Sequence, residues 1–264
     1  MMLTQPEWDW NRDTLIIDQD PMTHEQNKIN TEQKPVQIDL RIATYNVQSL
    51  AKPDKAAQIS KQCKKKGYHI IGIQESGTST AGQPSDLNYW RIAAGPQGEK
   101  KGDVEIWIAK SFPIATAPDG EKIKIMEHHI NVLMAHQRWM MVAIRTPVLK
   151  IDVMSIHAPV LQRGCPKSVQ EGVKFWKQID AGIKQRVNQN QIIILMDANT
   201  KLGRQTSPSV GNLEPDETNQ AGTALHDMLL THGLSAVNTF PHIHQGRSHT
   251  WENNQGHKSR IDYV

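Results

Sequence analysis

Short apolar runs separated by polar turn residues fill the chain from Asp39 onward. Several of them are rich in valine and isoleucine and alternate apolar with polar positions, which is typical of β-strands with at least one covered face. Three runs end in polar side chains: LRIATYN, HIIGIQES and QIIILMDANT. Further strands are predicted in NYWRIAA, VEIWIAK, KIKIMEHHI, RWMMVAIRT and LKIDVMSIHAP.

Helices are predicted at three places between these strands, and in the second of them apolar positions recur every three or four residues. They cover 53–66, 168–187 and about 221–232. The second helix opens with Ser168 and Glu171 in the spacing of a capping box. Many strands with few intervening helices favour an α+β fold or a layered sandwich over a doubly wound parallel sheet.

The chain divides into a leader and one domain. Residues 1–37 are polar and lack helical or strand periodicity, so we expect a flexible leader there. Residues 38–264 are enough for one domain with a core of ordinary size. The segment 201–220 is rich in Gly, Pro, Ser, Asn and Thr, which predicts a long surface loop.

Composition narrows the class of protein only a little. With 38% hydrophobic and 22% charged residues, the chain is typical of a globular protein. Its net charge of +3 and pI near 8.8 are compatible with a phosphate-rich partner. Two cysteines without a CxxC motif fit a reducing compartment, and the sequence has neither a signal peptide nor a membrane-spanning apolar run. We therefore expect an intracellular protein, nuclear or cytoplasmic, that is not secreted.

Polar residues at strand ends are the candidates for chemistry. Asn46, Glu75, Asp197 and Asn199 follow buried apolar runs, and several such strand ends meeting at one place would form a cage of oxygen atoms. Mg²⁺ and Mn²⁺ prefer carboxylate, amide and water oxygens and bind substrate phosphates directly. Any single one of these residues is more often an ordinary polar strand end, so only the four together indicate a metal site.

The blocks TYNVQSL, IQES, SIHAP, MDANT and HTWENNQGHKSRIDYV resemble, in this order, the motifs of the endonuclease/exonuclease/phosphatase family, with the nicking domains of non-LTR retrotransposons most similar. The resemblance runs from about Asp39 to Val264. It implies a four-layered α/β sandwich of two mostly antiparallel sheets flanked by helices. It further implies phosphodiester hydrolysis with Mg²⁺ or Mn²⁺, DNA as the partner, and a reverse transcriptase domain downstream in the full-length element. It specifies no oligomeric state.

The same resemblance implies roles for individual residues. Asn46 matches the amide that supports the metal and phosphate site, and Glu75 matches the principal metal ligand. Asp197 matches the aspartate that orients or deprotonates the attacking water, with Asn199 holding the phosphate. His157 stands where many relatives have a tyrosine, and a histidine can still donate to a phosphate oxygen.

The C-terminal blocks are where the sequence departs from the family. Asn219 and Trp251 match positions near the substrate, although both are more often structural. In relatives the aspartate of RIDY, here Asp262, orients a histidine in an Asp-His pair at the end of one more strand, whereas this sequence ends at Val264. We therefore expect a domain that lacks its last strand and has impaired hydrolysis.

Other functions stay open at this point. The chain could be a phosphatase or RNase of the same family, because the same cage serves many phosphoesters. It could also be a non-catalytic nucleic-acid-binding remnant or an unfolded fragment. Zinc is not favoured, since the histidines at 242, 244, 249 and 257 lack further ligands at recognised spacing.

Overall fold

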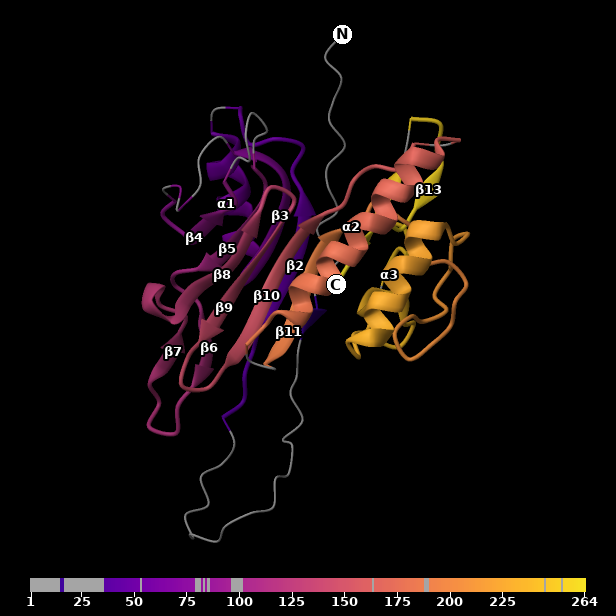
Figure 1. Ribbon diagram of the computed structural model, residues 1–264. Coiled ribbons are helices and arrows are strands. Elements are labelled where there is room, and N and C mark those ends of the chain that lie inside the picture. The colour runs from indigo at the N-terminus through magenta and orange to yellow at the C-terminus, as the bar shows by residue number, and fades with distance from the viewer. Residues whose placement is uncertain are drawn as a thin grey trace, which may run out of the picture.

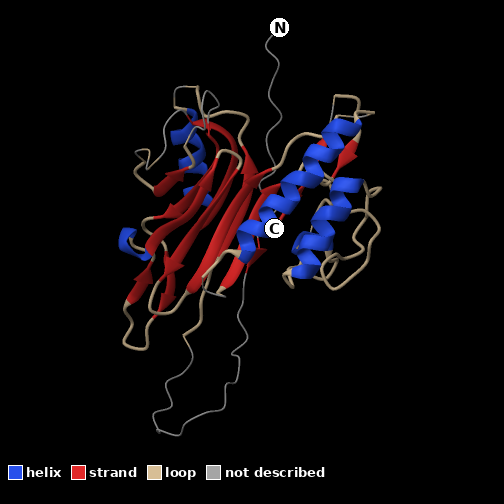
Figure 2. Ribbon diagram, viewed as in Figure 1, coloured by secondary structure: helices blue, strands red, loops and turns tan. Residues whose placement is uncertain are grey.

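The computed structural model describes residues 15–16, 36–52, 54–78, 82, 84, 86–95, 102–162, 164–187, 190–244, 246–252 and 254–264. Within this part of the chain, two five-stranded sheets pack against each other, and the helices lie on their outer sides (Figure 1, Figure 2). Most of the expected leader lies outside the described residues.

The first sheet has the strand order β1-β2-β3-β5-β4. Strands β2 and β3 run parallel, and the other neighbours are antiparallel. Isoleucine-rich runs form the central strands because β-branched side chains pack well on a pleated surface. The strands are β1 (Leu15–Ile16), β2 (Arg41–Asn46), β3 (Ile70–Thr78), β4 (Tyr89–Ala93) and β5 (Gly102–Ala109).

The second sheet has the order β14-β11-β10-β9-β8, in which only β10 and β11 are parallel. Its strands are β8 (Ile130–His136), β9 (Trp139–Arg145), β10 (Lys150–His157), β11 (Gln191–Asp197) and β14 (Asp262–Tyr263). Two small antiparallel pairs join β6 (Pro113–Thr116) to β7 (Lys122–Lys124) and β12 (Trp251–Glu252) to β13 (Lys258–Ser259). The helices are α1 (Lys55–Lys66), α2 (Pro166–Lys184) and α3 (Gln220–Thr231), with 3-10 turns η1 (Glu127–His129) and η2 (Val237–Thr239).

Three apolar clusters separate four layers. The first lies between the two sheets and joins isoleucine and valine side chains such as Ile106 and Val153. The second packs the outer face of the first sheet against α1 through Cys63. The third packs the outer face of the second sheet against α2 and α3 through residues such as Trp176 and Leu225. The α+β, four-layered sandwich of two mostly antiparallel sheets flanked by helices is thereby confirmed.

Gly72 of β3 lies at a close approach of the two sheets. A Cβ atom built on Gly72 would stand 2.5 Å from the Cβ atom of Leu195 in β11. Replacing Gly72 with alanine is therefore expected to destabilise the fold by about 1–3 kcal/mol, because added volume in a packed core forces the surroundings to shift. Thermal unfolding followed by circular dichroism should show a Tm lowered by roughly 2–4 °C per kcal/mol for a domain of this size. An unchanged Tm would mean that the sheets separate without cost.

The start of α2 differs from the sequence expectation of a helix over 168–187. The helix begins at Pro166, with Cys165 as its N-cap, and no side chain caps it. Proline is favoured at the first helical position because its missing N–H would have had no partner there. The hydroxyl of Ser168, already inside the helix, accepts instead from the backbone N–H of Gln162 at 2.8 Å. The expected capping box is therefore wrong.

The connection between β11 and α3 also differs in part from expectation. The segment 201–220 is irregular, as predicted, but it does not lie wholly at the surface. Leu202 and Val210 are buried in the cluster beneath α2 and α3. Burial of these apolar side chains is favourable because it removes them from water, but the polar composition of the surrounding segment gave no indication of it. Among the described residues, every helix is too short or too polar to cross a membrane.

Candidate active site

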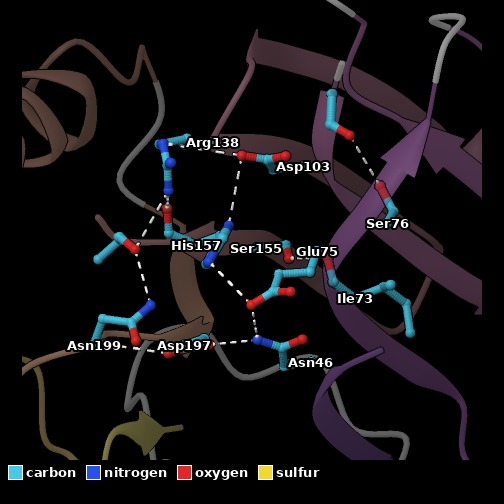
Figure 3. Close-up of polar contacts among 12 residues, drawn as sticks. Asn46, Ile73, Glu75, Ser76, Asp103, Arg138, Ser155, His157, Asp197 and Asn199 are labelled. Atoms are coloured by element: carbon cyan, nitrogen blue, oxygen red, sulfur yellow. Dashed lines mark hydrogen bonds and ion pairs between the residues drawn. The ribbon is translucent and has the colours of Figure 1, made fainter. Parts of the chain in front are cut away.

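Four of the expected site residues gather at one end of the two sheets (Figure 3). Asn46 ends β2, His157 ends β10 and Asp197 ends β11. Because β2 and β3 are parallel, as are β10 and β11, the carboxyl ends within each pair share one edge. Glu75 lies in β3 where the pairing with β5 is irregular, and its φ is +53°. Such a backbone conformation is uncommon for a residue other than glycine and is concentrated at functional sites.

The amide of Asn46 links carboxylates that come from different sheets. Its Nδ2 donates to Oε1 of Glu75 at 2.8 Å and to Oδ2 of Asp197 at 2.7 Å. Its Oδ1 accepts from the backbone N–H of Gln48 at 3.0 Å, which fixes the orientation of the amide. In this arrangement Asn46 holds the two carboxylates at a set separation, with its amide nitrogen rather than its oxygen directed at them.

Asp197 is the most deeply buried carboxylate of the group, with 3% of its surface exposed. Burial raises the pKa of Asp197 above its ordinary value, and the nearby charge of Glu75 acts in the same direction. The hydrogen bond from Asn46, the neighbouring His157 and the backbone N–H of Asn199 oppose this rise. A carboxylate with a raised pKa is better matched to accepting a proton near neutral pH.

Asn199 holds the turn that follows β11. Its φ is +45°, in the left-handed region that asparagine tolerates better than most residues. Its backbone N–H donates to Oδ1 of Asp197 at 3.2 Å, and its side-chain Nδ2 donates to the carbonyl of Ala158 at 3.0 Å. These contacts tie the ends of β10 and β11 together beside the buried carboxylate.

His157 stands opposite Asp197 in the parallel pairing of β10 with β11. Its Nε2 lies 3.7 Å from Oε1 of Glu75, and its Nδ1 lies 3.6 Å from Oδ2 of Asp103. Only 8% of its side chain is exposed, against 41% for Glu75. Neither ring nitrogen has a hydrogen-bond partner within the described part of the chain.

Asp103 and Arg138 are site residues that the sequence analysis missed. Arg138 Nε forms an ion pair with Asp103 Oδ2 at 3.9 Å, and its guanidinium donates to the carbonyls of His157 and Ala158 at 3.4 and 3.5 Å. Both residues stand near the start of a strand, β5 or β9, rather than at a strand end. Because these strands run antiparallel to β3 and β10, their beginnings lie at the same edge as the site. The signal in the sequence that could have indicated these two site residues is a charged residue at the start of a predicted strand.

A divalent cation fits the carboxylates of this cluster. Glu75, His157 and Asp197 each offer one ligand atom, and these atoms lie within 4.8 Å of one another. Carboxylate oxygens are the ligands that Mg²⁺ and Mn²⁺ prefer, and two carboxylates held this close repel each other unless a cation or proton lies between them. Within the described ranges, this is the group of acidic, histidine and cysteine side chains that meets this geometry.

The remaining expected residues lie around this cluster. Asp262 stands opposite Asp197 in the pairing of β14 with β11, and its backbone carbonyl accepts from Asn238 at 2.9 Å. Asn219 is the N-cap of α3, where its Oδ1 accepts from the backbone of Gly222 and from the hydroxyl of Thr200. Trp251 lies on the short strand β12 with 45% of its surface exposed. The described contacts give Asn219 a structural task and bring neither Asn219 nor Trp251 into the carboxylate cluster.

No family model matches this sequence, and no curated protein matches it. Solved structures do. The endonuclease domain of TRAS1, a telomere-specific non-LTR retrotransposon, is 17% identical over 85% of this chain and 83% of its own, with a TM-score of 0.52. The AP endonuclease LMAP from Leishmania major is 12% identical over 85% and 78%, with a TM-score of 0.56. The catalytic domain of APE2 from Xenopus laevis is 14% identical over 84% and 80%, with a TM-score of 0.53. At identities this low, the structural similarity establishes a shared fold and nothing beyond it.

Proposed function

We propose, from the premise that this chain has the fold of the endonuclease/exonuclease/phosphatase proteins, that it hydrolyses phosphodiester bonds and that its substrate is DNA. The observation that carries the proposal is the link that Asn46 makes between Glu75 and Asp197, since it brings a partly exposed and a buried carboxylate from two sheets together. Hydrolysis of a phosphoester uses a base that accepts the proton of water and a cation that neutralises charge on the phosphate, and this site places a buried base beside a cation site.

Each residue of the site has a separate role in the proposed hydrolysis. Glu75 would hold the divalent cation, with Asn46 keeping its carboxylate beside that of Asp197. When bound, the cation supplies neutralisation of the negative charge on the phosphate. Asp197 accepts the proton of the attacking water, a task that its burial favours. Asn199 is fixed at the same edge, and the second N–H of its side-chain amide is available to a phosphate oxygen.

DNA as the substrate rests on two supports. The similar structures are those of AP endonucleases and of a retrotransposon endonuclease domain. The Glu75 side chain is 41% exposed and that of Arg138 is 37% exposed, so the cluster opens to solvent beside the positive charge of Arg138. A polymer backbone can reach such a site, and arginine pairs well with phosphate.

Conversion of supercoiled plasmid to open circles tests the proposal. The chain with Mg²⁺ or Mn²⁺ is expected to nick the plasmid, at a low rate if hydrolysis is impaired as the sequence predicts, and the same chain with EDTA is expected not to, because the cation neutralises charge on the phosphate. Single-stranded RNA and p-nitrophenyl phosphate serve as substrates in parallel reactions. Faster cleavage of either one would contradict DNA as the substrate. Plasmid that stays supercoiled at all metal concentrations would contradict hydrolysis itself, and salt-sensitive DNA binding in that case would favour a binding function.

A further inference from the structure

The ring of His157 is buried and its two nitrogens lie between two carboxylates. Its side chain is 8% exposed, and neither nitrogen has a hydrogen-bond partner among the described residues. The nearest charged atoms are Oδ2 of Asp103, 3.6 Å from Nδ1, and Oε1 of Glu75, 3.7 Å from Nε2. Buried polar atoms are rarely left unpaired, so each nitrogen calls for a partner on its own side.

Asp103 is the partner on the Nδ1 side. The backbone N–H of Asp103 donates to the carbonyl of Gln137 at 2.8 Å, which joins β5 to the turn before β9. Arg138 lies 3.9 Å from the Asp103 carboxylate and also donates to the carbonyl of His157. The 3.6 Å separation is longer than a hydrogen bond, but the charge of a carboxylate held in this way favours the ring proton on Nδ1, and a neutral imidazole with its proton there has its lone pair on Nε2.

The Nε2 atom faces the acidic side of the cluster. It lies 3.7 Å from Oε1 of Glu75, and a ring nitrogen of His157 belongs, with a carboxylate oxygen of Glu75 and one of Asp197, to a set of ligand atoms within 4.8 Å of one another. A lone pair directed at carboxylate oxygens is repelled by them, and a cation between the three atoms removes the repulsion. Metal-bound histidines typically donate their other ring N–H to a carboxylate, which is the position that Asp103 occupies here.

We propose that Nε2 of His157 is a direct ligand of the metal ion, that Asp103 orients the ring as an outer partner, and that the nitrogen ligand makes the site prefer Mn²⁺ to Mg²⁺. This inference rests on the metal site of the proposed function. Both ions prefer oxygen ligands, but Mg²⁺ is the stricter of the two, whereas Mn²⁺ belongs to the transition-metal series that also binds sites with nitrogen ligands, so replacing one oxygen ligand with an imidazole nitrogen costs Mg²⁺ more than Mn²⁺. Asp103 is thus a positioning residue, because it acts on the metal only through His157.

Electron spin echo envelope modulation of Mn²⁺ bound to the whole chain tests the inference without turnover. The parent chain is expected to show modulation from a directly bonded nitrogen, and His157→Gln is expected to lose it. The control variant His242→Gln, which replaces an exposed histidine, is expected to keep the modulation. Bound Mn²⁺ without nitrogen modulation in the parent chain would overturn the inference, as would failure of the parent to bind Mn²⁺. Absence of modulation in the parent spectrum is decisive by itself, and modulation that persists in a folded His157→Gln variant would also overturn the inference, because another histidine would then be the ligand.

Calorimetric titration with Mn²⁺ and Mg²⁺ tests the role of Asp103. Asp103→Ala is expected to weaken Mn²⁺ binding by roughly 10–100-fold, as loss of an outer partner does elsewhere. Asp103→Asn should lie between it and the parent, because the amide keeps an oxygen that can face Nδ1 but loses the negative charge. The control Asp227→Ala alters an exposed side chain on α3 and should bind as the parent does. Equal losses of Mn²⁺ and Mg²⁺ affinity in His157→Gln would overturn the proposed preference.

The two proposals fail in different ways. Mg²⁺-dependent nicking together with a Mn²⁺ spectrum free of nitrogen modulation would leave the proposed hydrolysis standing and remove His157 as a ligand. Nitrogen modulation in a chain that cleaves no DNA would support the ligand assignment and contradict the hydrolysis.

Discussion

Glu75→Gln is expected to lower the rate of Mg²⁺-dependent plasmid nicking by on the order of a thousandfold, because a bound metal contributes several kcal/mol to the transition state and about 1.4 kcal/mol corresponds to tenfold in rate. Glutamine keeps the size of glutamate and an oxygen that can still accept from Asn46 Nδ2. The change therefore removes the charge that attracts the cation while preserving the link between the sheets. Initial rates of nicking at saturating DNA measure the effect.

Glu171→Gln is the matched control for this variant. Glu171 is exposed on α2 and is neutralised by the same substitution. It should nick at the parental rate, and both variants should melt at the parental Tm. Equal nicking by Glu75→Gln and the parent would show that Glu75 does not hold the catalytic metal. A lowered Tm in Glu75→Gln would instead assign the loss to folding.

Asp197→Asn is expected to have two opposite effects. Nicking should fall by on the order of 10²–10⁴-fold, the contribution of a positioned general base. Stability near neutral pH should rise in the absence of metal, because burial holds the pKa of Asp197 above its ordinary value of 3.8 and its charged form is costly in the folded state. Asparagine keeps the size of aspartate but has one oxygen, so it accepts either the hydrogen bond that Oδ2 takes from Asn46 or the one that Oδ1 takes from Asn199, and the lost bond offsets part of the gain in stability.

The pH dependence of this stability has a definite sign. A folded-state pKa raised above the unfolded value gives stability that is fully present below the unfolded pKa and is lost as pH rises through the folded pKa. The parent should therefore lose stability relative to Asp197→Asn as the pH rises from about the ordinary pKa of 3.8 through the raised one. Thermal melts with EDTA at several pH values measure the difference in Tm. A difference that stays constant with pH would mean that the charge of Asp197 carries no cost.

Much of the fold could be predicted from the local pattern. Runs such as HIIGIQES and QIIILMDANT form β3 and β11, because alternating or continuous β-branched residues have few other stable arrangements. The start of α2 could not be predicted as well. Its first turn has neither a side-chain cap nor an acidic residue, and Ser168 is used by the preceding loop instead.

The candidate site could be predicted in part. Asn46, Glu75 and Asp197 follow apolar runs, and the structure brings them into contact. Asp103 and Arg138 could not be found in this way, because a charged residue at the start of a strand is ordinary unless the direction of that strand is known. The antiparallel course of β5 and β9 places both residues beside His157.

The sequence by itself determined the layered α+β class and the polar strand ends, because period and residue type act over short distances along the chain. Only the tertiary structure decided which charges meet. Asn46 and Asp197 are separated by 151 residues and come from different sheets. Their contact depends on how closely the sheets pack, which Gly72 permits, and no local pattern encodes that distance. The partners of the two ring nitrogens of His157 were decided by the same packing.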